Sequence, residues 1–216
     1  MSDLIKLDLV DVDGAIHEAE ANVEGDSRAD FLRKAAVGGA AVVGGGTLLG
    51  LLPELADAKP SKKQDVAILN YALTLEYLEN EFYKEGLRTA GLTGDLLSAA
   101  RIVQGHEATH VAALKKALGR KAVKKPSFDF GATTSNSADF LKTAVVLEDT
   151  GVSAYAGQGP RIKQKAVVVT ALAIHSVEAR HAAYLRGLND QNFAPRAFDK
   201  PATMKAVLKK AKPFLA

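Results

Sequence analysis

Cysteine and tryptophan are both absent from the 216 residues of this chain. Without cysteine, the chain has no means to form a disulfide framework, a thiolate metal site, an iron–sulfur cluster or a cysteine nucleophile. Aromatic residues make up only 6% of the sequence, so platforms that stack nucleic-acid bases are not expected. The 47% hydrophobic and 25% charged residues are typical of a globular protein and exclude a disordered chain.

The net charge of +3 conceals two chemically different parts. Residues 1–58 contain four Lys or Arg and eleven Asp or Glu, whereas residues 59–216 contain 24 Lys or Arg and 14 Asp or Glu. The second part is basic enough to meet an anionic cell-surface polymer or a membrane surface. Because helix C-termini also attract lysine, a solvated basic face is the alternative interpretation. The clustered cations are Lys115, Lys116, Arg120, Lys121, Lys124 and Lys125, followed by Lys205, Lys209, Lys210 and Lys212.

The N-terminal part has the layout of a signal peptide. Ala35 to Leu52 carry no charge, Arg28, Arg33 and Lys34 precede them, and Ala56-Asp57-Ala58 is a small-x-small cleavage pattern. The basic stretch resembles a twin-arginine export signal, although Ala29 stands where the second arginine belongs. Three interpretations stay open: a cleaved export signal, an uncleaved anchor with the domain facing out, and a segment packed in a cytoplasmic protein.

These observations divide the chain into four parts. We expect an acidic N-terminal tail, an export signal or anchor, a helical bundle, and a basic C-terminal tail or short helix. Their ranges are 1–27, 28–58, 59–190 and 191–216.

From Ser61 onward, apolar residues recur at helical spacing and predict four long helices. Ser61, Thr93 and Asn136 are expected N-caps, Gly119 is an expected stop, and Pro160 suits the first turn of the last helix. The expected ranges are 62–88, 94–118, 137–156 and 160–187.

The long connection between the second and third helices predicts the topology. The other two links are short, so each pair of helices forms an antiparallel hairpin. Residues 120–135 are long enough, if extended, to run back along the bundle. The sequence therefore predicts an all-α up-down-down-up four-helix bundle with one long crossover.

A Glu-x-x-His motif occurs twice, and a glutamate with a tyrosine seven residues later also occurs twice, at offsets of 71 and 72 residues. Glu and His three residues apart share a helix face and can offer a carboxylate and an imidazole to one metal. Two such motifs, with one glutamate from each other helix, supply a di-metal carboxylate site inside a bundle. The predicted metal ligands, which are also the predicted catalytic residues, are Glu76, Glu107, His110, Glu148, Glu178 and His181.

Other side chains are candidates for the surroundings of these ligands. Tyr83 and Tyr155 could donate hydrogen bonds to ligand carboxylates or be ordinary core tyrosines. His175 could be an outer donor, an extra ligand or a core histidine. Glu79 could support the ligands or metal access, but a surface position is favoured. His106 is expected to point away from the ligand face.

Residues 62–190 resemble the ferritin-like superfamily, which includes bacterioferritins, rubrerythrins and manganese catalases. They are most similar to the ferritin-like domain family that includes desiccation-related proteins, which bacteria often export. The resemblance implies that the six residues are the ligands and that either Glu107 with Glu148, or Glu76 with Glu178, bridges two metals. It leaves a homo-oligomer open.

Carboxylate and imidazole ligands suit Fe(II) and Mn(II), so the expected cofactor is two iron or two manganese ions, with iron preferred. The expected function is that of an exported protein acting on Fe(II), dioxygen or peroxide in oxidative or desiccation stress, as a ferroxidase, peroxidase or catalase-like oxidoreductase. The alternative is a non-enzymatic stress or surface-binding protein whose metals only staple the bundle. A cytoplasmic, DNA-protecting relative is less favoured, because the export signal argues against a nucleic-acid partner.

Overall fold

The computed structural model describes residues 60–216. The expected acidic tail and export signal or anchor, residues 1–58, lie outside the described residues. No helix in the described part of the chain is both long and apolar enough to span a membrane. Its α-helices are α4 (Lys62–Thr89), α5 (Gly94–Leu118), α6 (Ser137–Gln158), α7 (Lys165–Leu188) and α8 (Met204–Ala211).

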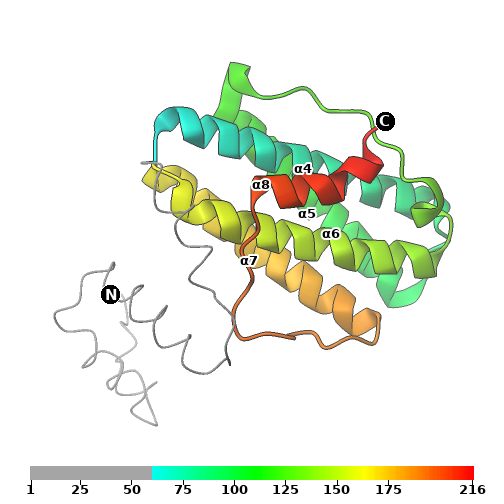
Figure 1. Ribbon diagram of the computed structural model, residues 1–216. Coiled ribbons are helices and arrows are strands. Elements are labelled where there is room, and N and C mark those ends of the chain that lie inside the picture. Colours follow the sequence, from blue (N-terminus) through cyan, green and yellow to red (C-terminus); the bar gives the residue numbers. More distant parts are fainter. Residues whose placement is uncertain (1–59) are drawn as a thin grey trace, which may run out of the picture. The chain divides into compact units, whose positions relative to one another are not determined.

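Four of these helices form two hairpins, α4 with α5 and α6 with α7, which pack against each other. After α5, the chain passes through the 3₁₀ turn η3 (Gly119–Lys121) and runs along the bundle (Figure 1). It then reaches the 3₁₀ turn η4 (Gly131–Thr134), directly before α6. The predicted all-α bundle with one long crossover is confirmed.

The predicted caps explain where the helices begin and end. The Ser61 hydroxyl accepts a hydrogen bond from the backbone N–H three residues later at 3.1 Å. At the start of α6, the side-chain amide oxygen of Asn136 accepts a hydrogen bond from the backbone N–H of Asp139 at 2.9 Å. Thr93 precedes α5, but its side chain makes no cap hydrogen bond. Gly119 ends α5 with φ of 54°, a conformation that favours glycine.

The predicted start of the fourth helix at Pro160 is wrong, because α7 begins only at Lys165. Pro160 belongs instead to the 3₁₀ turn η5 (Gly159–Arg161). The buried Asp65 carboxylate of α4 accepts hydrogen bonds from the backbone N–H groups of Lys163 at 2.8 Å and Gln164 at 3.0 Å. Burial alone would raise the pKa of Asp65, but these hydrogen bonds outweigh it and lower the pKa. These hydrogen bonds engage the backbone of Lys163 and Gln164, so α7 begins only at Lys165.

Two apolar clusters occupy opposite ends of the bundle. The aromatic end is built around Phe82 and Phe140, whose rings stack with centroids 4.8 Å apart, and it includes Phe130 and Val207. The aliphatic end contains Ile68, Leu69, Leu73, Leu114, Leu118, Ile162 and Ile174. The predicted metal ligands lie in the helix turns between the two ends.

The helix α8 lies in the basic C-terminal part and packs over α6 and α4 (Figure 1). The segment before it touches α6, where Ala202 N–H donates to the Ser153 carbonyl at 2.9 Å. A Cβ at Gly157 would lie 2.0 Å from the Ala202 carbonyl oxygen, so this contact requires glycine. Beyond α8, Leu215 forms an antiparallel bridge with Phe128 of the crossover.

Substitution of two helical glycines by alanine should change the free energy of unfolding in opposite directions. A Cβ at Gly86 would lie 2.0 Å from the Phe140 ring, so Gly86→Ala should lower the free energy of unfolding by about 1–3 kcal/mol through overpacking. A Cβ at Gly105 would meet open space, so the control Gly105→Ala should raise it by about 0.5–1 kcal/mol. Urea denaturation measures both, and effects of the same sign would contradict this packing.

Candidate metal centre

Each of the four bundle helices brings one glutamate to the same level between the two apolar ends. Glu76 comes from α4, Glu107 from α5, Glu148 from α6 and Glu178 from α7. All four side chains are completely buried. Ionised carboxylates are costly inside protein unless they are paired or bind a metal, so their shared burial marks a site.

Two histidines complete the cluster, and both turn Nδ1 toward the glutamates. His110 Nδ1 lies 3.1 Å from Glu76 Oε2, 3.2 Å from Glu107 Oε2 and 3.0 Å from Glu178 Oε1. His181 Nδ1 lies 3.1 Å from Glu148 Oε2 and 3.3 Å from Glu107 Oε1. In a helix, side chains lean toward the N-terminus, so each histidine reaches back to the glutamate three residues earlier.

The six side chains form two overlapping groups whose ligand atoms lie within 4.8 Å of one another. Both groups contain Glu107 and Glu178; Glu76 and His110 complete one, and Glu148 and His181 complete the other. The structure thus brings together all six residues predicted from the sequence. The two glutamates shared by both groups, Glu107 and Glu178, are those of the two Glu-x-x-His motifs. This pair differs from both bridging pairs that the resemblance implied.

A family model described as a ferritin-like domain matches residues 64–191, which is more than half of the chain and includes both groups. The chain belongs to this family. No curated protein matches the chain.

The buried carboxylates and imidazoles of the ferritin-like site fit a metal ion. Among the described residues, three carboxylate oxygens of the site are buried without a hydrogen-bond partner: Glu107 Oε1 and both oxygens of Glu178. Glu178 Oε1 is only 3.0 Å from His110 Nδ1, but this contact does not have hydrogen-bond geometry. Such orphaned acceptors are expensive, and a cation between the carboxylates would be a partner for all of them. Oxygen and imidazole donors suit iron and manganese.

Two buried tyrosines orient the outer glutamates. The Tyr83 hydroxyl donates to Glu148 Oε1 and the Tyr155 hydroxyl donates to Glu76 Oε1, each at 2.5 Å. Burial, followed by the charge of its glutamate partner, raises the pKa of each tyrosine well above its usual value, so both remain donors. Each hydrogen bond engages Oε1 and leaves Oε2 facing an imidazole. The hydrogen bonds to ligand carboxylates that the sequence suggested are present.

Glu79 is a fifth buried glutamate near the site, so its favoured surface position is wrong. Its exposure is 3%. A Cβ at Gly151 would lie 3.2 Å from Glu79 Oε1, so this carboxylate uses the space left by a glycine of α6. Gly151 is also the counterpart of Glu79 at the repeat offset of 72 residues. Burial, followed by the charge of Glu178 and the other glutamates, raises the pKa of Glu79 well above its usual range.

His175 does not join either group of ligand atoms. Its Nε2 lies 3.8 Å from Asp199 Oδ2, in the segment that leads to α8. Because it precedes Glu178 in the helix, its side chain leans away from the site, whereas that of His181 leans back toward it. The structure therefore gives no contact for the expected role of His175 as an outer donor or extra ligand.

His106 supports the site through a contact that the sequence analysis missed. Its Nδ1 lies 2.9 Å from His181 Nε2. When His181 Nδ1 faces a metal, the ring proton sits on Nε2, so His181 donates and His106 accepts. Partial desolvation, followed by the neighbouring His181, lowers the pKa of this exposed imidazole. The repeat counterpart of His106 is Val177, so the other histidine ligand has no equivalent of this contact at that position.

His106→Ala should weaken metal binding at one of the two positions. Loss of an outer hydrogen bond to a ligand typically costs about 10–100-fold in affinity. We expect this loss for the group that contains His181, with the affinity of the other group nearly unchanged, in a titration with Mn(II). Val177→Ala is the matched control and should leave both affinities unchanged. An equal loss at both positions would contradict the asymmetry.

Without metal, the folded site should hold protons that the unfolded chain releases. Burial raises the pKa of Glu148 to about 8, from an ordinary value of 4.5. Burial and neighbouring carboxylates raise the pKa of Glu107 well above its usual range. Burial would lower the pKa of His110 and His181, but the surrounding glutamates outweigh it and raise both to about 12. Glu178 is the exception, because the two imidazoles overcome the effect of burial and lower its pKa to about 2.

The metal-free protein should therefore lose stability as the pH rises from about 5 to about 8. A group whose pKa is raised by folding stabilises the folded state below its unfolded pKa, and this contribution disappears as the pH approaches the folded pKa. Urea unfolding at both pH values measures the change. Mn(II) should reverse the trend, because the metal replaces these protons. Greater stability of the metal-free protein at pH 8 than at pH 5 would contradict the electrostatics described above.

Proposed function

We propose that the chain is a di-iron carboxylate protein that oxidises Fe(II) with dioxygen or peroxide, in protection against oxidative or desiccation stress. The observation that carries the proposal is the pair of overlapping donor groups that share Glu107 and Glu178. Two redox-active ions held in such groups can divide a two-electron change between them. With dioxygen, two Fe(II) ions would each lose one electron, and dioxygen would gain two electrons and two protons to give hydrogen peroxide.

The chain's own residues would orient the ligands, exclude bulk water from the site and supply a proton. Tyr83 and Tyr155 hold the two outer glutamates in place. The aromatic and aliphatic ends keep bulk water from the centre of the bundle. Glu79, whose proton is held by burial, lies beside Glu178 and could supply that proton when charge changes in the site. These roles support an oxidoreductase.

The same donors would also accept two manganese ions, with disproportionation of peroxide as the reaction. Iron remains the preferred assignment.

We also propose that the protein is exported through its twin-arginine-like segment, with an outward-facing anchored form as the alternative. The support is the order of basic, uncharged and small-x-small residues within 28–58.

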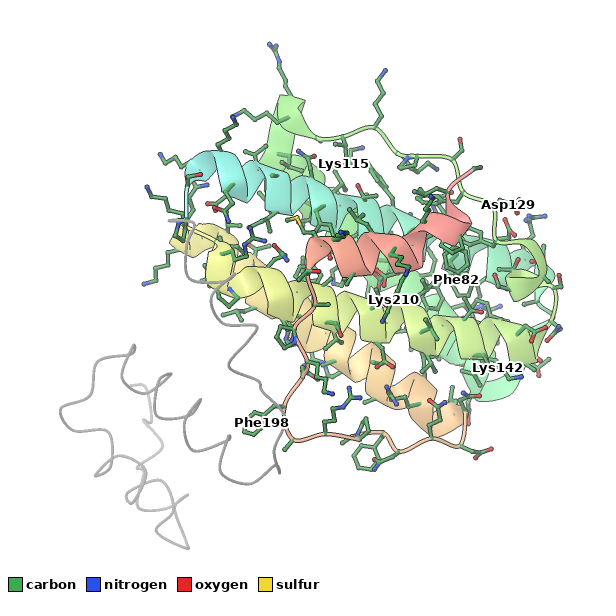
Figure 2. All side chains as sticks on the ribbon, in the orientation of Figure 1. Phe82, Lys115, Asp129, Lys142, Phe198 and Lys210 are labelled. Carbon is green, nitrogen blue, oxygen red and sulfur yellow. The ribbon has the colours of Figure 1, made fainter. Side chains whose placement is uncertain are left out.

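A non-enzymatic surface-binding protein is the second candidate function, and the distribution of lysines favours it. The lysines at the end of α5 and on α8 are exposed. Lys115 and Lys210, labelled in Figure 2, represent the two clusters. An anionic polymer or membrane surface would be the partner, and the metals would then only stabilise the bundle.

Substitution of one ligand distinguishes the two functions. Glu148→Gln keeps the side-chain volume but removes one carboxylate, and it should slow Fe(II) oxidation by more than about 100-fold, beyond the usual cost of losing an outer contact. The helical circular dichroism should persist. Glu81→Gln is the control, since Glu81 lies at the surface with Lys84 and Lys125 and should leave the rate unchanged.

Metal content of the protein isolated from its native host completes the test. Mass spectrometry should find about two equivalents of iron or manganese per chain, as a four-helix carboxylate site of this kind holds. A folded protein that contains neither ion and takes up neither would rule out the catalytic proposal and leave the surface-binding candidate.

A further inference from the structure

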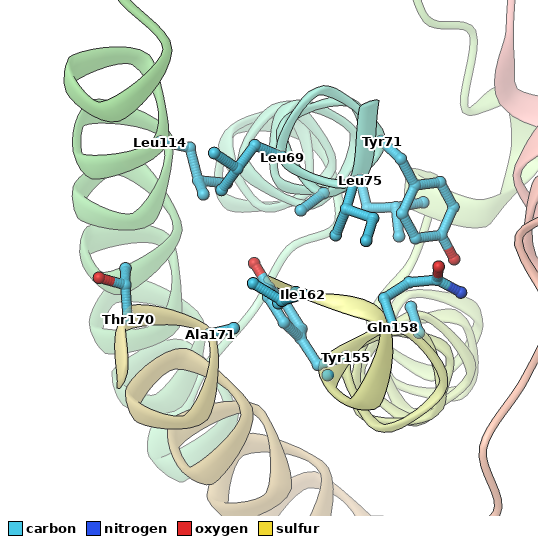
Figure 3. A pocket seen from close by; sticks show the side chains of 13 residues that line it. Leu69, Tyr71, Leu75, Leu114, Tyr155, Gln158, Ile162, Thr170 and Ala171 are labelled. Atoms are coloured by element: carbon cyan, nitrogen blue, oxygen red, sulfur yellow. The ribbon is translucent and has the colours of Figure 1, made fainter. Parts of the chain in front are cut away.

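A small apolar cavity lies at the aliphatic end of the bundle, among α4, α5, α6 and the start of α7 (Figure 3). Its volume is about 20 Å³. This exceeds the roughly 10–15 Å³ that one water molecule needs, so one small molecule fits. The apolar part of its wall includes Leu69, Leu75, Leu114, Ile162 and Ala171.

The polar side chains of the wall offer little to a water molecule. Gln158 Oε1 already accepts a hydrogen bond from Arg161, and the Thr170 hydroxyl donates to the Ala166 carbonyl. The Tyr71 hydroxyl is the one side-chain polar atom of the wall that is buried without a partner. A buried water needs two to four polar partners, so this cavity suits a small, weakly polar molecule better.

One side chain connects the cavity to the metal centre. The Tyr155 ring forms part of the cavity wall, and its hydroxyl donates to Glu76 Oε1 at 2.5 Å. Figure 3 shows this ring reaching into the space between the helices. A molecule in the cavity is therefore separated from a ligand of the proposed metal centre by the width of one tyrosine.

We propose that this cavity binds dioxygen before it reacts at the metal centre. The inference rests on the proposed function and deepens it, because it selects dioxygen over peroxide as the oxidant. Hydrogen peroxide has two O–H groups and would leave most of its hydrogen bonds unmade in this cavity, which is costly. Dioxygen is small and apolar and loses little on leaving water.

Xenon tests the cavity without any need for turnover. In crystals of the metal-free protein under xenon pressure, we expect one xenon atom among the wall residues. Ala171→Leu adds bulk to the wall and should abolish this binding. Ala173→Leu is the matched control, because Ala173 is exposed on the same helix and should leave the xenon in place. If Ala171→Leu fails to fold, Ala72→Val fills the cavity from α4 instead.

Kinetics tests the link to the reaction. The filled variant should raise the KM for dioxygen in Fe(II) oxidation by about tenfold, the lower range for one misfitted group in an apolar pocket. The rate with hydrogen peroxide should be unchanged. A cavity that stays empty under xenon, or a filled variant with an unchanged KM for dioxygen, overturns the inference. A wild-type protein that binds xenon but oxidises no Fe(II) overturns the proposed function instead.

Discussion

Five glutamates buried in the middle of a helical bundle repel one another, and much of the surrounding structure limits that repulsion. Two imidazoles face the four central carboxylates, and two tyrosine hydroxyls each hold one of the outer pair. Burial and the neighbouring charges keep a proton on Glu79. These contacts oppose the cost of burial only in part, since three carboxylate oxygens still have no hydrogen-bond partner. The two apolar ends must therefore stabilise a bundle whose centre is built for a ligand rather than for packing.

The sequence predicted those features that depend on spacing within one helix. A Glu-x-x-His motif fixes its own geometry, because residues three apart share a helix face. The repeated offset then indicated which residues of the other two helices would meet it. The features it missed depend on contacts between helices. The start of α7 is set by Asp65, which accepts a hydrogen bond from the backbone of Lys163, 98 residues later in the chain. The burial of Glu79 depends on a glycine of α6, and the contact of His106 depends on how closely α5 and α7 approach.

Membership of the ferritin-like domain family establishes the fold and agrees with the set of donors. It does not identify which reaction the site carries out. The choice among reactions lies in the surroundings of the donors. The apolar cavity behind Tyr155 is the basis for the proposed apolar oxidant, whereas the exposed lysines are the basis for the proposed anionic partner at the surface. These features occupy different parts of the bundle, so substitutions can alter one and leave the other intact.

The repeat that builds the centre is broken at two places beside it. Glu79 has a glycine as its counterpart, and His106 has a valine. An additional carboxylate, that of Glu79, thus lies beside Gly151 and Glu178, and one of the two imidazoles, that of His181, donates a hydrogen bond to the exposed His106. The two donor groups look interchangeable when only their ligands are counted, but their environments differ. In the proposed two-ion centre, a spectroscopic probe that senses single ions would therefore resolve two environments, where the ligand count alone suggests one.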